Sequence, residues 1–282
     1  MLYKGRRQSS NVEDMRGAGL GRKIGVRGGI VTVIIAIVVI LLGGDPREIL
    51  GLMESQQVST EQVTDYQPSA HEQELTEFVS VVLADTEDVW HKLFEGSGLT
   101  YREPKLVLFN SAVESACGYA QSATGPFYCP ADEKVYIDLN FLEQLQERLG
   151  AQGDFAVAYI VAHEVGHHVQ KLLGTLDKVH SLRGNVSEKQ YNEQTVRLEL
   201  QADFYAGIWA HHAQKMKNIL EAGDIEEAMN AAQAVGDDRI QMQSRGYVVP
   251  DSFTHGTSEQ RMTWFKRGFT TGNVNNGDTF GE

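Results

Sequence analysis

Basic residues are scarce in this chain of 282 residues, which has 25 lysines and arginines against 38 aspartates and glutamates. Seven of the basic residues lie within residues 1–27, together with only two acidic ones, so the rest of the chain carries a net charge of −18. An acidic body of this kind repels nucleic acids, and no basic patch with interleaved aromatic residues offsets it. We therefore predict that the protein has no nucleic-acid partner.

Cysteine is almost absent as well, since Cys117 and Cys129 are the only two in the sequence. The turn-rich stretch between them contains Gly125 and Pro126. An even number of cysteines at short separation predicts one disulfide between Cys117 and Cys129, if the body of the chain lies outside the cytoplasm as an apolar run near the N-terminus indicates. Buried free thiols and a second metal site are the alternatives, but no histidine lies nearby at ligand spacing.

Long apolar runs are also rare, and the one clear example lies near the N-terminus. Residues 30–42 are uncharged and apolar and are bracketed by glycine pairs, so that residues 28–44 reach the lower end of the length that crosses a bilayer as a helix. We predict a single transmembrane anchor over residues 28–44. A cleaved signal peptide is the alternative, but the stretch before the run is long and no clean small-x-small cleavage site follows it.

The charge on either side of this run predicts an orientation. Residues 1–27 carry a net charge of +5. By the positive-inside rule this segment stays in the cytoplasm and the remainder crosses. We therefore expect a single-pass protein of the cell inner (cytoplasmic) membrane, with its N-terminus cytoplasmic and its main domain periplasmic or extracellular.

The most informative motif is His163-Glu164-Val165-Gly166-His167, which follows the apolar, glycine-free residues 155–162. On a helix, residues four apart share a face, so His163 and His167 can bind one metal ion. Glu164 points to a neighbouring face, from which it can reach a metal-bound water without binding the metal itself. This is the general-base arrangement of the HExxH motif.

A catalytic zinc ion needs a third protein ligand and an open position for water. Glu199, at the start of a predicted helix over residues 199–212, is our candidate, and Asp203 falls on the same helical face. Asp203 can accept the other ring N–H of a ligand histidine, which we expect to be His163. The alternative is that both are ordinary surface acids. Their occurrence after HExxH, in this order, predicts a zinc site.

Residues 161–170 and 198–207, which contain these motifs, resemble the bacterial putative neutral zinc metallopeptidase family, and the resemblance extends over nearly the whole chain. The Glu-x-x-Ala-Asp form is also similar to the wider gluzincin group, which includes the CAAX prenyl proteases and the membrane-bound heat-shock proteases. The resemblance implies Zn²⁺ as the cofactor. It also implies that His163, His167 and Glu199 are the zinc ligands. By the same resemblance Glu164 is the catalytic residue and Asp203 supports a ligand.

A third segment, residues 254–261, is similar to the His-Pro-Ser-Thr-x-x-Arg element near the end of gluzincin protease domains, although Gly256 replaces the proline. By this resemblance His255 is a catalytic candidate that donates to a tetrahedral oxyanion, while Arg261 orients it or a carboxylate. The alternative is a capping and salt-bridge cluster at a helix start, with Ser258 as the cap.

Other residues near the motifs are expected to have structural roles. Gly166 inside a helix costs about 1 kcal/mol relative to alanine, which predicts close approach of another backbone. Residues 236–239, Gly-Asp-Asp-Arg, resemble a further signature of the same family. We expect Asp237 and Asp238 to cap the helix that follows, the alternative being that they shape the mouth of the site.

The fold class that we predict is α+β and mostly helical, a zincin-like metallopeptidase domain with a small sheet, preceded by one N-terminal transmembrane helix. Strands are expected at residues 104–109 and 134–139. We expect the backbone of Tyr136 to Asp138 to pair with an extended substrate, an ordinary edge strand being the alternative. We predict five parts along the chain. They are a basic cytoplasmic segment (residues 1–27), the anchor (28–44), a polar linker (45–70), the metallopeptidase domain (71–270) and a flexible tail (271–282).

The function that these residues predict is that of a membrane-anchored zinc metallopeptidase, a hydrolase that acts on a peptide or protein substrate. A non-catalytic zinc-binding envelope scaffold or chaperone is one alternative, and Glu164 argues against it because a structural site does not need that carboxylate. A zinc hydrolase of non-peptide amide bonds is another alternative, which would share all the site residues because substrate choice lies in the walls of the cleft.

Overall fold

The computed structural model describes residues 1–17, 66–121, 125–142 and 153–281. The predicted anchor, residues 28–44, lies outside the described residues, as does most of the predicted linker. Among the residues that the structure does describe, no helix is both long enough and apolar enough to cross a membrane. The chain divides into two compact units, one of residues 1–15 with 68–282 and the other of residues 16–67.

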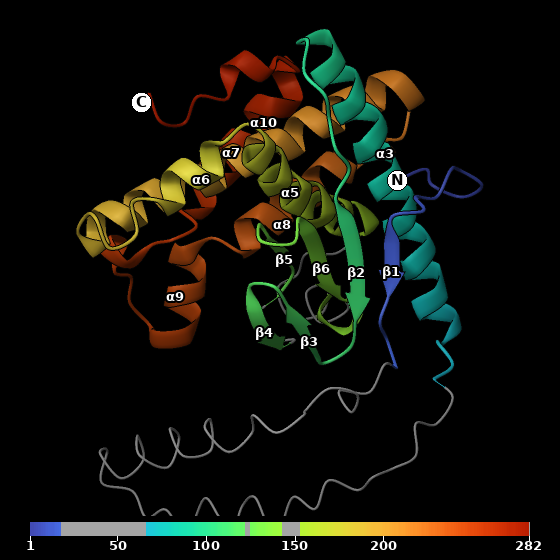
Figure 1. Ribbon diagram of the computed structural model, residues 1–282, viewed down its shortest axis with the longest axis horizontal. Helices are drawn as coiled ribbons and strands as arrows, with labels where there is room; N and C mark the ends of the chain where they lie inside the picture. Colours follow the sequence, from blue (N-terminus) through green and yellow to red (C-terminus); the bar gives the residue numbers. More distant parts are fainter. Residues whose placement is uncertain (18–65, 122–124, 143–152, 282) are drawn as a thin grey trace, which may run out of the picture. The chain divides into compact units, whose positions relative to one another are not determined.

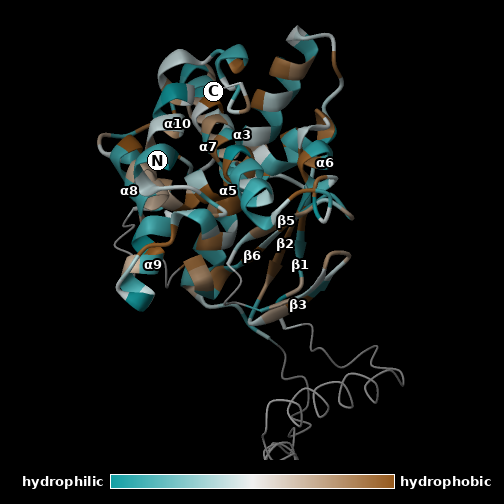
Figure 2. Cartoon of the chain, turned by 90° about the vertical axis from the view of Figure 1, so that its left-hand side faces the viewer, coloured by the Kyte–Doolittle hydropathy of each residue, from teal (hydrophilic) through white to brown (hydrophobic). Residues whose placement is uncertain are grey.

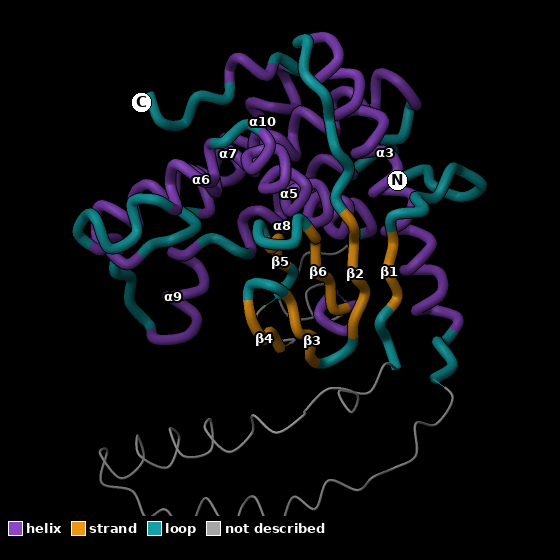
Figure 3. The backbone as a smooth tube through the Cα atoms, viewed as in Figure 1, coloured by secondary structure: helices purple, strands orange, loops and turns teal. Residues whose placement is uncertain are grey.

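The larger unit contains a four-stranded sheet with strand order β1-β2-β6-β5 (Figures 1 and 3). β2 and β6 are parallel and in register from Lys105–Lys134 to Phe109–Asp138, β1 joins β2 in parallel, and β5 is antiparallel to β6. A separate hairpin is formed by β3 and β4. The bounds are Val12–Asp14 (β1), Lys105–Phe109 (β2), Ala112–Ser115 (β3), Gly118–Gln121 (β4), Phe127–Cys129 (β5) and Lys134–Asp138 (β6).

The expectation that the backbone of Tyr136 to Asp138 pairs with substrate is wrong at Tyr136, where β6 has β2 on one side and β5 on the other. The pairing with β5 covers Lys134 to Tyr136 and ends before Ile137. The outer strand on this side is β5, which the sequence analysis did not find. A strand of three residues preceded by Pro126 is too short to show an alternating pattern.

Long helices pack on and beside this sheet (Figure 1). Three of them begin with a capping box, in which an N-cap hydroxyl and a residue three positions on satisfy each other's backbone N–H groups. In α10 the cap is Thr257 with Gln260, and the predicted cap, Ser258, is the first helical residue. The helices are α3 (Ala70–Gly96), α5 (Asp154–Leu172), α6 (Thr175–His180), α7 (Glu188–Lys217), α8 (Asp224–Ala234), α9 (Asp237–Arg245) and α10 (Ser258–Thr271), with short 3-10 helices η3 (Pro250–Ser252) and η4 (Val274–Asn276).

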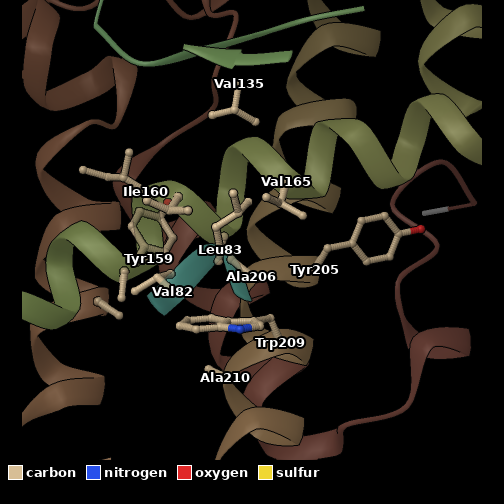
Figure 4. Packing of buried hydrophobic residues seen from close by; sticks show 14 of the residues in the cluster. Val82, Leu83, Val135, Tyr159, Ile160, Val165, Tyr205, Ala206, Trp209 and Ala210 are labelled. Carbon is tan, nitrogen blue, oxygen red and sulfur yellow. The ribbon is translucent and has the colours of Figure 1, made fainter. Parts of the chain in front are cut away.

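The main hydrophobic core lies where α3, α5 and α7 meet the sheet (Figure 4). The ring of Phe155 stacks on Trp209 with centroids 5.7 Å apart, and Trp90 meets Tyr205 edge to face at 5.4 Å. Figure 2 shows hydrophobic residues along the strands. Because α5 and α7 are both held by this core, the residues on their facing surfaces have fixed positions.

Helices α7 and α10 are in backbone contact at two glycines. A Cβ atom on Gly268 would lie 2.1 Å from the carbonyl oxygen of Phe204, and one on Gly207 would lie 2.1 Å from that of Phe265. Neither helix can move away without opening the core, because Phe204 and Phe265 are both fully buried. The two glycines therefore set the distance between α7 and α10.

We expect Gly268→Ala to lower the free energy of unfolding by at least about 3 kcal/mol, the upper end for overpacking, because its clash is with backbone atoms. Gly96→Ala is a matched control, since a Cβ there meets no atom within 4 Å. That control is expected to stabilise the protein by up to about 1 kcal/mol. Urea unfolding of the two variants checks this, and equal midpoints would contradict the close contact.

The two ends of the chain differ from the predicted boundaries. Residues 1–15 belong to the same unit as residues 68–282, where β1 pairs with β2. The predicted flexible tail, residues 271–282, is held against α7: Arg197 donates to the carbonyl oxygen of Phe280 at 2.7 Å, and Gln201 donates to that of Gly277 at 2.9 Å. Both contacts join segments that are far apart in the sequence.

The predicted disulfide is confirmed, with Cys117 and Cys129 bonded and their Cα atoms 5.8 Å apart. It joins the turn between β3 and β4 to the last residue of β5. The outer strand of the sheet is thereby fixed to the β3–β4 hairpin as well as to β6.

Candidate metal centre

The structure brings together the three predicted ligands. His163 and His167 lie one turn apart on α5, Glu199 lies on α7, and their ligand atoms are all within 4.8 Å of one another. The Nε2 atom of His163 is 3.2 Å from Oε2 of Glu199, and that of His167 is 3.4 Å from Oε1. Each histidine thus faces one oxygen of the same carboxylate.

The close approach of α5 to α7 depends on Gly166. A Cβ atom at this position would lie 3.0 Å from the carbonyl oxygen of Ala202 and 3.2 Å from its Cα. This confirms the predicted role of Gly166, which is to let another backbone come near. A larger residue there would move Glu199 away from the two histidines.

The other ring nitrogens of the two histidines are held by polar side chains. Nδ1 of His163 lies 2.8 Å from Oδ1 of Asp203, as expected, and Nδ1 of His167 lies 2.9 Å from Oε1 of Gln170. Gln170 also donates to the carbonyl oxygen of Leu198 at 2.7 Å, which links α5 to α7. With each Nδ1–H donated to an acceptor, Nε2 is the nitrogen of each neutral ring whose lone pair is available to a metal ion.

This donor set fits Zn²⁺. Two imidazole nitrogens and one carboxylate, here from side chains that are 8–13% exposed, form a known ligand set of catalytic zinc, in which a fourth position stays open. The fit depends on the orientation of the rings, which the Nδ1 contacts determine, as well as on the identity of the residues. We find that these three residues can hold the metal that the sequence predicts.

Asp203 lies at the centre of a buried polar network. Arg261 donates to both of its oxygens, from Nε at 2.8 Å and from Nη2 at 3.0 Å, and Tyr159 donates its hydroxyl to the same carboxylate. Arg261 therefore orients a carboxylate, which was one of its two expected roles. Tyr159 was not among the predicted site residues, although it precedes His163 by one helical turn.

The electrostatic environment favours the charged form of Asp203. Burial alone would raise its pKa, but the charges of Arg261 and His163 and their hydrogen bonds outweigh burial and lower it to about 2. Because the pKa is lower in the folded state, this stabilisation is present above about pH 4 and is lost as the pH falls toward 2.

The lowered pKa predicts a pH dependence. The difference from the ordinary value of 3.8 corresponds to about 2 kcal/mol of stability that disappears between about pH 5 and pH 2. The Asp203→Asn variant should have a lower free energy of unfolding than the parent at pH 5. Its free energy of unfolding should fall less than that of the parent as the pH is lowered. Urea unfolding at several pH values in this range measures how the free energy of unfolding depends on pH, with Asp251→Asn, at an exposed position, as the control. Parallel pH dependences for the parent and Asp203→Asn would contradict the prediction.

Protons compete with a metal cation for the ligand atoms. Burial lowers the pKa of His163 and of His167, but nearby carboxylates outweigh it and raise both above the usual value. Burial also opposes ionisation of Glu199, yet the facing histidines lower its pKa well below the usual value. Metal binding must therefore release protons, and the affinity must fall with falling pH.

Glu164 and the three ligands line one cavity of about 470 Å³. Glu164 comes from α5 and its side chain is buried. Elsewhere the walls are largely apolar, and β5 forms part of them. The apolar and aromatic lining residues include Pro126, Phe127, Tyr128, Phe141, Ile160, Leu176, Leu198, Val235 and Ile240.

His255 also lines this cavity, and a neighbouring acid holds it there. Oδ2 of Asp237 accepts backbone N–H groups from Thr254, His255 and Gly256 at 2.8, 2.6 and 3.0 Å, and Oδ1 lies 3.4 Å from Nδ1 of His255. The expectation that Asp237 caps the helix after it is wrong, because no side chain caps α9. Asp237 instead secures the loop that carries His255.

The backbone conformation of Gly256 explains why glycine stands here in place of the proline of the gluzincin element. Its φ is +90°, which proline cannot adopt because its ring holds φ near −65°. The loop before α10 therefore has a different backbone from one built on His-Pro, while His255 still reaches the cavity.

A second group of acids, Asp154, Asp224 and Glu227, also lies within 4.8 Å but contains no histidine. The α-ammonium group of Met1 donates to Asp154 at 2.7 Å and to Asp224 at 3.3 Å. These carboxylates thus already face a cation, and we assign no metal to them.

Comparison with known proteins agrees with this site. The family model described as "Putative neutral zinc metallopeptidase" matches residues 1–280. "Uncharacterized protein YpfJ" of Escherichia coli (strain K12) is 51% identical over 287 residues, which cover 100% of this chain and 99% of that protein. "Uncharacterized protein Rv2575" of Mycobacterium tuberculosis (strain ATCC 25618 / H37Rv) is 44% identical over 202 residues, 68% of this chain and 66% of the relative. No solved structure matches the chain.

Proposed function

Because this chain belongs to the putative neutral zinc metallopeptidase family, we propose that it is a zinc-dependent peptidase whose metal is held by His163, His167 and Glu199. The observation that carries the proposal is the presence of Glu164 in the same cavity as these three converging ligands. When bound, Zn²⁺ acts as a Lewis acid that polarises a carbonyl group and lowers the pKa of a water molecule.

Glu164 is the general base in this proposal. Its carboxylate accepts the proton of the attacking water and passes it to the nitrogen of the leaving amine. Its neighbour His163 is oriented by Asp203, which Arg261 and Tyr159 hold in turn. This network fixes α5 and therefore the position of Glu164 relative to the ligands.

His255 is the proposed donor to the oxyanion that forms at the scissile carbonyl. Burial lowers its pKa, but Asp237 and Glu199 outweigh burial and raise it, which favours a ring that carries protons on both nitrogens. Thr254 and Asp237 lie beside Nδ1, so Nε2 is the nitrogen that remains to donate.

The cavity walls support a peptide substrate. β5 lines the cavity and is the outer strand of the described sheet on that side, so an extended peptide could pair with it by strand addition. The disulfide at Cys129 and the pairing with β6 hold β5 in place. The apolar lining residues Ile160 and Leu198, near the ligands on α5 and α7, favour an apolar side chain next to the scissile bond.

Attachment to a membrane through residues 28–44 is also part of the proposal. It is supported by the uncharged, apolar composition of the run, which the sequence alone provides. Attachment would restrict the enzyme to substrates at or near a membrane surface.

Zinc content and peptide cleavage test the proposal. The full chain should contain one zinc per molecule by elemental analysis, and it should create new peptide ends in a library of peptides, detected by mass spectrometry. A chelator should stop cleavage, and added zinc should restore it. A folded chain that binds no zinc when zinc is supplied would contradict the metal centre, whereas zinc without cleavage of any peptide would favour a scaffold.

A further inference from the structure

The first fifteen residues are built into the main domain. β1 extends the sheet, with Val12 opposite Leu106 and Asp14 opposite Leu108. Leu106 donates its backbone N–H to Asn11 at 2.9 Å, and Met15 donates to Leu108 at 2.8 Å. Figure 1 shows β1 beside β2 and α3. A parallel pair of this kind requires both strands to be in one folded unit.

Two buried acids on α3, Asp85 and Glu87, have partners in this segment, and Asp85 also pairs with Lys217 of α7 at 2.8 Å. Arg6 lies 2.6 Å from Asp85, whose side chain is 2% exposed, and Arg7 lies 2.9 Å from Glu87, whose side chain is 3% exposed. Asn11 also donates to Glu87, at 2.9 Å. A buried carboxylate that loses its partner is strongly destabilising. The segment is thus part of the charge balance of α3.

The same segment balances charge at the edge of the sheet. The carboxylate of Glu13 lies 2.6 Å from the ammonium group of Lys105 and 2.6 Å from that of Lys134, which belong to β2 and β6. Three strands are therefore joined by one side chain of β1. The attachment combines backbone pairing, ion pairs with buried acids and this surface cluster.

We propose that residues 1–15 and residues 68–282 lie on the same side of any membrane that the chain contacts. The chain leaves this unit after Met15 and returns to it at Pro68, so the predicted anchor lies between two segments of one domain. A single crossing between them would place β1 and β2 on opposite sides of the bilayer. The inference does not depend on the proposed peptidase activity.

This arrangement changes how the basic N-terminal residues are understood. The positive-inside rule counts cations that remain on the cytoplasmic side. In the folded unit, Lys4 pairs with Glu74 at 2.8 Å, and Arg6 and Arg7 pair with acids of α3. These three cations pair with acids of the main domain, so they do not by themselves indicate a cytoplasmic location for residues 1–15.

Cysteine labelling in intact cells tests the proposal on the full chain. Lys4 and Lys266 are both exposed, one in the N-terminal segment and one on α10. Lys4→Cys and Lys266→Cys variants are treated with a membrane-impermeant maleimide before and after permeabilisation, with the parent chain as background. We expect both positions to react under the same condition. Reaction of one position only after permeabilisation, while the other reacts before it, would overturn the proposal.

A cross-link tests the docking itself. Glu13→Cys combined with Lys105→Cys places two thiols at positions whose native side chains touch. A short bis-maleimide added to intact or permeabilised cells should join the two peptides within one chain, as read by mass spectrometry. The pair Glu13→Cys with Lys266→Cys is the matched control and should not be joined. Failure of the first pair to cross-link, while each thiol is labelled singly, would contradict the docked segment.

Discussion

Glu199→Ala is expected to weaken zinc binding by more than about 100-fold and to abolish peptide cleavage with it. Loss of an outer hydrogen-bond partner of a ligand already costs about 10–100-fold in affinity, and loss of a ligand itself must cost more. Glu199 is the one member of the converging group that comes from α7, and its two oxygens face both histidines. The variant leaves two imidazoles on one helix, without the charge that favours a dication.

The measurement is the zinc content of the purified chain at a series of buffered free zinc concentrations. Glu193→Ala is the matched control, because Glu193 lies on the same helix but is exposed. The control should bind zinc as the parent does. If Glu199→Ala keeps the parent affinity, then Glu199 is not a ligand and the third ligand must be sought elsewhere in the cavity.

Glu164→Gln is expected to lower kcat for peptide cleavage by about 10²–10⁴-fold while leaving one zinc per chain. The amide keeps the size of the side chain but can no longer accept the proton of the attacking water. The zinc should stay because Glu164 is not among the three side chains whose ligand atoms converge. KM should change little, since binding of the peptide backbone and side chains is unaffected.

The comparison uses the peptide that the parent cleaves fastest, with Glu193→Gln as the matched control and zinc content measured on every sample. Cleavage that persists unchanged in Glu164→Gln would remove this residue from the mechanism. Loss of both zinc and cleavage would instead assign Glu164 a structural or ligand role. The two variants, Glu199→Ala and Glu164→Gln, thus separate holding the metal from moving the proton.

Several predictions that succeeded concern short distances along the chain, whereas those for Glu199 and Asp203, which lie 36 and 40 residues after His163, came from the order of the motifs and from the family resemblance. His163 and His167 had to share a face because they are four residues apart on a helix, and that geometry is local. The disulfide joins cysteines only 12 residues apart. The cost of glycine in a helix predicted the close backbone contact at Gly166, although not which helix makes it.

The residues that were missed act through contacts that no local pattern shows. Gln170 is three positions after His167 and is an ordinary helical residue until α7 is packed beside it. Asp237 was assigned to its own helix, whereas its carboxylate binds a loop 17 to 19 residues further on. β5 has three residues and acquires its role as an outer strand only from its position beside β6.

The sequence by itself identified the candidate site: which side chains can hold a zinc ion, which carboxylate lies next to them, and which cysteines pair. These predictions came from residue identity and spacing, from the period of a helix and from resemblance to a known family. The tertiary structure alone decided how close α5 and α7 come, where His255 stands, which strand borders the cavity and that residues 1–15 complete the sheet. These contacts join segments far apart in the chain, such as Arg7 with Glu87 and Val12 with Leu106, and depend on packing rather than on any pattern within one segment.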